Sequence, residues 1–134
     1  MNQVLIAAYF RAFNAGDWEG MLSLVTDDVV HDLNQGGREV GKDALRAHLR
    51  QMGRCYHEEI VDLEVMSSDD GRRAAAEYTV LGTYINTDGD QPQARCQVYR
   101  LPAGAFFALR DGRIARITSY HNQQDWLHQI EEAA

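Results

Sequence analysis

The stretch YFRAFNAGDWEGMLSLVTDDVVHD, which spans residues 9–32, decides the fold that we expect for this chain of 134 residues. Apolar side chains recur at helical spacing from Leu5 to Phe13, and Gly16 supplies the left-handed turn that commonly ends a helix. Asp17 is then the expected N-cap of a second, short helix. The stretch therefore predicts a helix, a glycine hinge, a short helix and a strand that ends on an acidic residue.

The strand predicted over 29–33, after a turn at 27–28, points its side chains alternately to the two faces of a sheet. Val30 and Asp32 share one face, and His31 lies on the other. Because neighbours on a strand face opposite ways, His31 and Asp32 cannot both enter one pocket without a bulge. We assign the pocket side to Asp32 and a structural role to His31.

Beyond this stretch the chain predicts mostly sheet. A third helix is expected over 42–52, and a last one after Asn122. Turn-rich segments separate five predicted strands, over 59–66, 73–85, 94–101, 105–110 and 113–121. Pro102 and Gly104 are expected to bend the chain between the third and fourth of these. Without a repeat or linker, residues 1–134 predict a single α+β domain, with helices packed on one face of a curved antiparallel sheet and a pocket between them.

Composition and charge narrow the class of protein. A hydrophobic content of 45% and a charged content of 25% are ordinary for a soluble globular domain. The net charge of −7 disfavours nucleic acid and anionic membranes as partners. The first 13 residues have no basic lead and are interrupted by Arg11, so they predict neither a signal peptide nor a membrane span. Cys55 and Cys96 form no CxxC pair, which favours reduced thiols in a cytoplasmic protein.

Sequence motifs give no support for a cofactor. The five histidines show neither HxH nor HExxH spacing, so we expect no metal site. The segment NQGGREVG at 34–41 lacks the Lys-Ser/Thr ending of a phosphate-binding loop, and no GxSxG motif is present. Nucleotide, nicotinamide and flavin chemistry are therefore not expected.

The quoted stretch resembles the opening of the ketosteroid isomerases and of their nuclear-transport-factor-2-like relatives, including the SnoaL-like polyketide cyclases. Two later segments resemble the corresponding parts of that superfamily, GREVGKDALRAHL at 37–49 and LPAGAFFALRDGRIARITSYHN at 101–122. The resemblance covers most of the chain and is greatest for the ketosteroid isomerase-related proteins. It implies a cone-shaped, curved antiparallel sheet wrapped around the N-terminal helices, an apolar pocket, and a homodimer formed through the outer sheet face.

The resemblance also implies roles for individual residues. In the ketosteroid isomerases, a tyrosine donates a hydrogen bond to the developing oxyanion and an aspartate shuttles the proton. These positions match Tyr9 and Asp32, provided that the following loop is one residue shorter; otherwise Leu33 takes the second position. The family's second, acidic oxyanion donor matches Gly104, which argues against steroid isomerisation itself. His121, at the end of the last strand, is the candidate to replace that donor.

Each candidate also has a plainer interpretation. Tyr9 could be a core aromatic residue, Asp32 a surface carboxylate, and His121 a strand-end histidine bonded to the following helix. In the catalytic interpretation these three are the active groups, and the pocket is lined by Phe13, Val30, Gly104, Phe106, Ile117 and Ser119.

Two functions from different classes remain open on the sequence. One is a cofactor-independent isomerase, cyclase or lyase that abstracts a proton from a small hydrophobic carbonyl compound. The other is a non-catalytic ligand-binding or dimerisation module of the same fold, since a fold does not determine a function.

Overall fold

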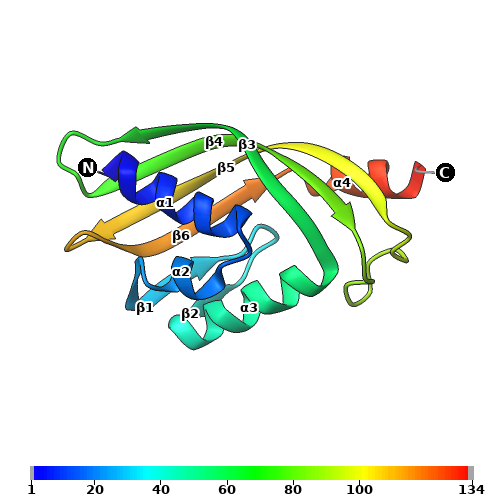
Figure 1. The fold of residues 1–134 in the computed structure, drawn as a ribbon, viewed down its shortest axis with the longest axis horizontal. Helices are drawn as coiled ribbons and strands as arrows, with labels where there is room; N and C mark the ends of the chain where they lie inside the picture. The colour runs from blue at the N-terminus through cyan, green and yellow to red at the C-terminus, as the bar shows by residue number, and fades with distance from the viewer. Residues whose placement is uncertain (1, 133–134) are drawn as a thin grey trace.

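The computed structural model describes residues 2–132, and Figure 1 shows a curled sheet with helices packed against it. The helices are α1 (Asn2–Asn14), α2 (Trp18–Leu22), α3 (Lys42–Cys55) and α4 (Gln123–Glu132). The strands are β1 (Val25–Asp32), β2 (Arg38–Val40), β3 (Tyr56–Ser67), β4 (Arg73–Tyr84), β5 (Gln97–Arg110) and β6 (Arg113–His121). Within this part of the chain, no helix is long and apolar enough to cross a membrane.

The strands form one open sheet in the order β2-β1-β6-β5-β4-β3, and the expected α+β architecture is confirmed. Irregular pairing makes the sheet curl. β3 bulges between Val61 and Glu64, where Asp62 adopts a φ of +54°, and the β5–β6 register shifts after Ala108. Because bulges bend a strand and increase its twist, the concave face wraps around α1 (Figure 1).

The core lies between α1 and the concave face of the sheet. Ile6 and Phe10 of α1 are buried, and the ring of Phe10 lies 4.9 Å from that of Tyr78 on β4. Alternate residues of β4 are buried, beginning with the small side chains of Ala74 and Ala76. Because alanine side chains are small, they leave room for α1 to lie close to this part of β4.

Three expectations about the strands are wrong. A turn was expected at Asp27 and Asp28, but β1 already begins at Val25 and includes both residues, whose carboxylates are exposed. β2 was not expected, and it pairs antiparallel with the end of β1. β1 in turn runs parallel to β6, so the sheet is mixed rather than an antiparallel meander.

Pro102 does not break β5, which is a single strand where two were expected. The backbone N–H and C=O of Arg100 bond to the side chain of Gln129 on α4, so they point away from β4. Residues two apart on a strand point their backbone groups to the same side, so the nitrogen of Pro102 also points away from β4. On that side β6 begins to pair only at Ala103. The missing N–H of proline therefore costs no hydrogen bond in the sheet, and the strand continues.

Candidate functional site

The candidate site is a cavity of about 370 Å³ between the concave face of the sheet and the helices, which we call the interior cavity. This volume is within the range of small-molecule sites, roughly 300–1,000 Å³. Most of its wall is apolar, with side chains that include Phe10, Met21, Leu45, Leu49, Ile60, Val80, Leu101, Phe107, Ile117 and Trp126. A few polar groups also reach it, among them Tyr9, His31, His48, Glu58, Tyr78, Ser119 and His121.

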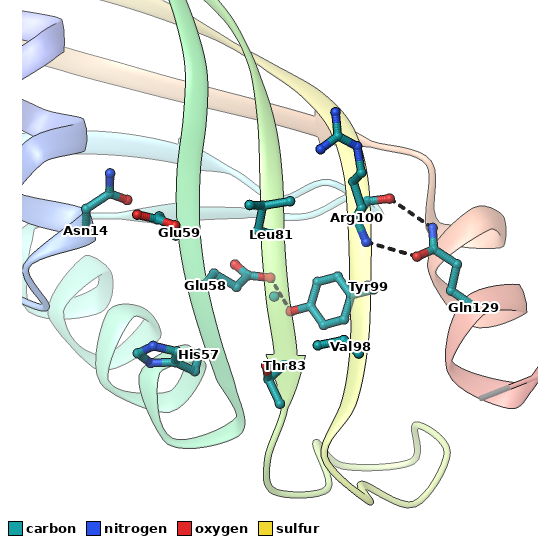
Figure 2. Close-up of a pocket in the computed structure, with 11 residues that line it drawn as sticks. Asn14, His57, Glu58, Glu59, Leu81, Thr83, Val98, Tyr99, Arg100 and Gln129 are labelled. Carbon is teal, nitrogen blue, oxygen red and sulfur yellow. Dashed lines mark hydrogen bonds between the residues drawn. The ribbon is translucent and has the colours of Figure 1, made fainter. Parts of the chain in front are cut away.

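A second hollow, of about 640 Å³, runs across β3, β4 and β5 to α4 and is shown in Figure 2. His57, Glu59 and Arg100 line this outer groove, and all three are exposed. A ligand there would keep much of its contact with water, whereas the interior cavity removes a ligand from water. We therefore place the candidate site in the interior cavity.

Five of the residues singled out from the sequence line the interior cavity: Tyr9, Phe13, Ile117, Ser119 and His121. Tyr9 and Phe13 are four residues apart on α1 and share its inward stripe. The three β6 residues alternate inward along their strand, as a period of two requires.

The expected position of Asp32 in the pocket is wrong. β1 turns His31 towards the interior cavity, so its neighbour Asp32 lies on the outer face of the sheet. There the Asp32 carboxylate accepts hydrogen bonds from Arg38 Nε at 2.7 Å and from Thr118 Oγ1 at 2.9 Å. The hydrogen bond from Arg38 holds the pKa of Asp32 below its ordinary value, which is the opposite of what a base in an apolar pocket needs. Leu33, the alternative in the family register, does line the cavity.

Val30, Gly104 and Phe106 also lie on the outer face rather than in the pocket. Because β5 is one continuous strand, Ala105 pairs with Ser119 and faces inward, which turns the residues on either side of it outward. The Phe106 side chain is 50% exposed. Its neighbour Phe107 is the aromatic residue of β5 that lines the cavity.

Glu58 is one of two acidic residues that line the interior cavity, the other being Asp88, and sequence reasoning missed it; Glu58 also borders the outer groove. The residue stands on β3 opposite Gly82, and Gly82 in turn pairs with Tyr99. The Tyr99 hydroxyl donates a hydrogen bond to the Glu58 carboxylate, as Figure 2 shows. A methyl group on Gly82 would lie 2.2 Å from the Tyr99 ring, so the glycine makes the space that the ring crosses.

The environment of Glu58 favours its protonated form. Burial raises the pKa of this carboxyl, whereas the hydrogen bond from Tyr99 and the charge of His121 lower it to a lesser extent. A carboxyl with a raised pKa in a cavity is a candidate for acid–base chemistry near neutral pH. One signal was present in the sequence: Glu58 precedes Ile60 by two residues, so both face inward on one strand.

Tyr9 presents an available hydroxyl donor in the cavity. Its ring packs edge-on against those of Phe10 and Phe107, at 5.6 and 6.1 Å between centroids. Burial, together with the neighbouring Tyr78, raises the pKa of Tyr9 and keeps the hydroxyl protonated. That hydroxyl has no hydrogen-bond partner among residues 2–132, so it is available to a bound molecule.

His121 lines the cavity but is also bonded to the segments around it. Its Nε2 lies 2.9 Å from Gln123 Oε1, and its backbone N–H donates to Asn34 Oδ1 at 2.8 Å. The structure thus contains the contact with the start of the last helix that was the plainer interpretation of this residue. The ring remains near enough to Glu58 for its charge to affect that carboxyl.

His31 and His48 of the cavity wall form, together with Glu39, the only group of metal-capable side chains found among the described residues. Burial lowers the pKa of His31, and the charge of His48 lowers it further. Both imidazoles are therefore neutral near pH 7, since burial also lowers the pKa of His48.

The curled sheet, the helices on its concave side and the apolar cavity between them define a cone-shaped α+β fold. The family model described as a SnoaL-like domain matches residues 6–117, and this chain belongs to that family. The expected SnoaL-like, nuclear-transport-factor-2-like superfamily is thereby confirmed.

Solved structures agree with this assignment. The chain is similar to proteins described as candidate polyketide cyclases from a Silicibacter species (51% identity, TM-score 0.94, covering 96% of this chain and 93% of that one) and from Xanthomonas campestris (48%, 0.93, 96% and 95%). An epoxide hydrolase of the LEH-like type from M. tuberculosis, at 17% identity and a TM-score of 0.75 over 96% of this chain and 88% of that one, shares the fold alone. No curated protein matches the sequence significantly.

Proposed function

We propose that this chain is an enzyme of the isomerase or cyclase type, which moves a proton on a small apolar carbonyl compound bound in the interior cavity. One observation carries the proposal: a largely apolar cavity holds both a carboxyl group with a raised pKa, Glu58, and a phenolic hydroxyl without a protein partner in the described chain, Tyr9. The similarity to candidate polyketide cyclases supports the same class of reaction.

In this proposal Glu58 is the acid–base group. Its ionised form takes a proton from the carbon next to the carbonyl, and the electron pair of the broken C–H bond moves to the carbonyl oxygen to form an enolate. The protonated Glu58 then returns the proton to the same or to another carbon. The raised pKa brings the carboxyl closer to the working pH, where proton transfer in both directions is efficient.

Tyr9 donates the hydrogen bond that stabilises the enolate oxygen. A protonated hydroxyl in a water-poor cavity stabilises developing negative charge better than it would in water. His121 takes no direct part in the proton transfer, because its Nε2 is already engaged by Gln123. No metal or other cofactor enters these proton-transfer steps.

A non-catalytic ligand-binding module is the second candidate function. It is favoured by one observation: two positions of the isomerase pattern, Asp32 and Gly104, contribute no acidic group to the cavity. Deuterium exchange on a bound ketone separates the two functions, because only the enzyme would catalyse it.

We further propose that the protein is a homodimer that pairs through the outer face of its sheet. This face exposes five large apolar side chains: Val40, Met66, Val98, Phe106 and Tyr120. Exposed apolar patches of this kind mark interaction sites. A second copy is the partner that fits, because a twofold contact joins identical patches, and the Asp32 charge on this face is already neutralised by Arg38.

Exchange of α-protons for deuterium tests the catalytic proposal without knowledge of the natural product. The protein is incubated in D₂O with small cyclic ketones, 2-tetralone first, and exchange is followed by proton NMR. We expect catalysed exchange that Glu58→Gln lowers by about 10²–10⁴-fold. Tyr9→Phe should lower it by about 10²–10³-fold, the usual loss for one oxyanion donor.

The matched control is Glu59→Gln, which removes a neighbouring carboxylate on the same strand that lies in the outer groove instead of the cavity. This variant should exchange at the wild-type rate. If Glu58→Gln is as active as the wild type, the assignment of the base is wrong. If the ketones bind and no exchange occurs, the binding module is the correct function.

A further inference from the structure

Three side chains from three elements meet beside the interior cavity: His31 of β1 and His48 of α3, which line it, and Glu39 of β2. Each offers one ligand atom, and these atoms all lie within 4.8 Å of one another. Glu39 Oε1 is 3.7 Å from His31 Nδ1 and 3.8 Å from His48 Nδ1. The two imidazole rings are edge-to-face neighbours, with centroids 4.7 Å apart and an angle of 69° between their planes.

The fold brings these residues together although 8 and 9 positions separate them along the chain. His31 and Glu39 are direct cross-strand partners in the β1–β2 pair. α3 follows β2 immediately and packs on β1, and Leu45 and Leu49 anchor the helix in the core on either side of His48. No spacing motif within one element could have predicted such a site.

Two of the three ligand atoms have no hydrogen-bond partner in the described structure. His31 Nδ1 and Glu39 Oε1 are both buried, and the His31 side chain is only 10% exposed. Buried polar atoms are nearly always paired, because an unpaired one loses the free energy of hydration. The separations of 3.7 and 3.8 Å are too long for hydrogen bonds, for which about 3.2 Å is the upper limit.

An ion placed between these atoms would satisfy both of them. Nitrogen and oxygen ligands lie about 2.0–2.2 Å from Zn²⁺, so two ligands of a tetrahedral ion are about 3.4 Å apart. The observed separations are close to that spacing. Two imidazoles and one carboxylate also suit zinc and its neighbours among the transition metals better than Mg²⁺ or Ca²⁺, which prefer oxygen ligands.

We propose that His31, Glu39 and His48 form a binding site for one divalent transition-metal ion of the Zn²⁺ type. Three protein ligands leave a coordination position for water or a ligand. Because both imidazoles line the interior cavity, the ion lies at its wall, where the free position accepts a carboxylate oxygen of a bound molecule. Metal binding here is independent of the proposed proton transfer by Glu58.

A direct titration tests the site, with untagged protein and Co²⁺ as a spectroscopic probe. We expect one equivalent of Co²⁺ to bind and to give the visible absorption bands of a low-coordinate cobalt site. Zn²⁺ should displace it stoichiometrically and raise the thermal midpoint, since a ligand that binds only the folded state stabilises it. His48→Gln and Glu39→Gln should each weaken binding by at least about 100-fold, since even a partner that only orients a ligand contributes about 10–100-fold.

The matched control is His128→Gln, which removes a histidine from another His–Glu pair, the exposed contact of His128 with Glu132 on α4 at 3.3 Å. Its Co²⁺ binding should equal that of the wild type. Far-UV circular dichroism checks that each variant folds; His48 and Glu39 are less buried than His31 and serve as the decisive variants. Less than one equivalent bound by the wild type, or equal binding by the wild type and the two decisive variants, would overturn the proposal.

Discussion

At the scale of single residues, the Glu58 carboxyl makes stability depend on pH. Burial raises its pKa above the ordinary value of 4.5, so between 4.5 and the raised value the folded protein binds more protons than the unfolded chain. Stability therefore decreases as pH rises through that window, and the contribution is fully present only below it. Tyr99, Tyr78 and His121 are the titratable groups that interact with this carboxyl.

Glu58→Gln should remove this dependence, because an amide does not titrate and still accepts the hydrogen bond from Tyr99. The free energy of unfolding, measured in urea from pH 4 to pH 8, should decrease less with pH in the variant than in the wild type. The exposed Glu59→Gln serves again as the control and should follow the wild-type curve. Parallel curves for Glu58→Gln and the wild type would contradict the raised pKa.

At the scale of elements, two side-chain amides close free edges of the sheet. Gln129 of α4 donates to the carbonyl of Arg100 at 3.0 Å and accepts from its N–H at 2.9 Å, as the dashed lines of Figure 2 show. Asn14, at the end of α1, makes the same pair of bonds to Ile60 on β3, at 3.0 and 2.8 Å. Each amide takes the place of a neighbouring strand, which protects an edge and fixes a helix against the sheet.

Asn14→Ala and Gln129→Ala should each lower the free energy of unfolding by roughly 1–3 kcal/mol, the value of two backbone hydrogen bonds at about 0.5–1.5 kcal/mol each. Urea unfolding measures the loss. Gln124→Ala is the matched control, because Gln124 is an exposed residue of the same helix as Gln129, and it should change stability by less than about 0.5 kcal/mol. Equal stabilities of Gln129→Ala and Gln124→Ala would show that edge closure contributes nothing.

At the scale of the whole molecule, the outer sheet face determines the expected assembly. Phe106 and Tyr120 pack against each other there at 6.0 Å between ring centroids and are 50% and 53% exposed. A second copy would cover both rings and release the water that now contacts them. The interior cavity lies against the concave face of the sheet, on the side opposite to the proposed contact.

Light scattering after size exclusion should give a mass of twice 15.1 kDa for the wild type and of 15.1 kDa for Phe106→Lys. The control is Val4→Lys, since Val4 is a more exposed apolar residue, at 71%, on α1 away from that face. It should remain a dimer. A monomeric wild type at micromolar concentration would refute the homodimer.

The kinds of element and their layering could be predicted from the amino-acid sequence. Helical spacing from Leu5 to Phe13, the glycine at 16 and the alternation of β6 are local patterns, and local patterns specify which side of an element is apolar. The family resemblance, added to these patterns, placed Tyr9 and His121 at the cavity, and both residues line it. The SnoaL-like family followed from the same segments.

Which face of β1 and β5 points inward depends on how the strands pair in the folded protein. A shift of one residue moves a strand's whole set of side chains to the other face, and that choice depends on pairing with β6, to which β1 is parallel. Asp32 and Phe106 therefore lie outside, and His31 and Phe107 inside. Glu58 beside Tyr99, and His31 beside Glu39 and His48, are contacts between different elements, which no pattern within one element can encode.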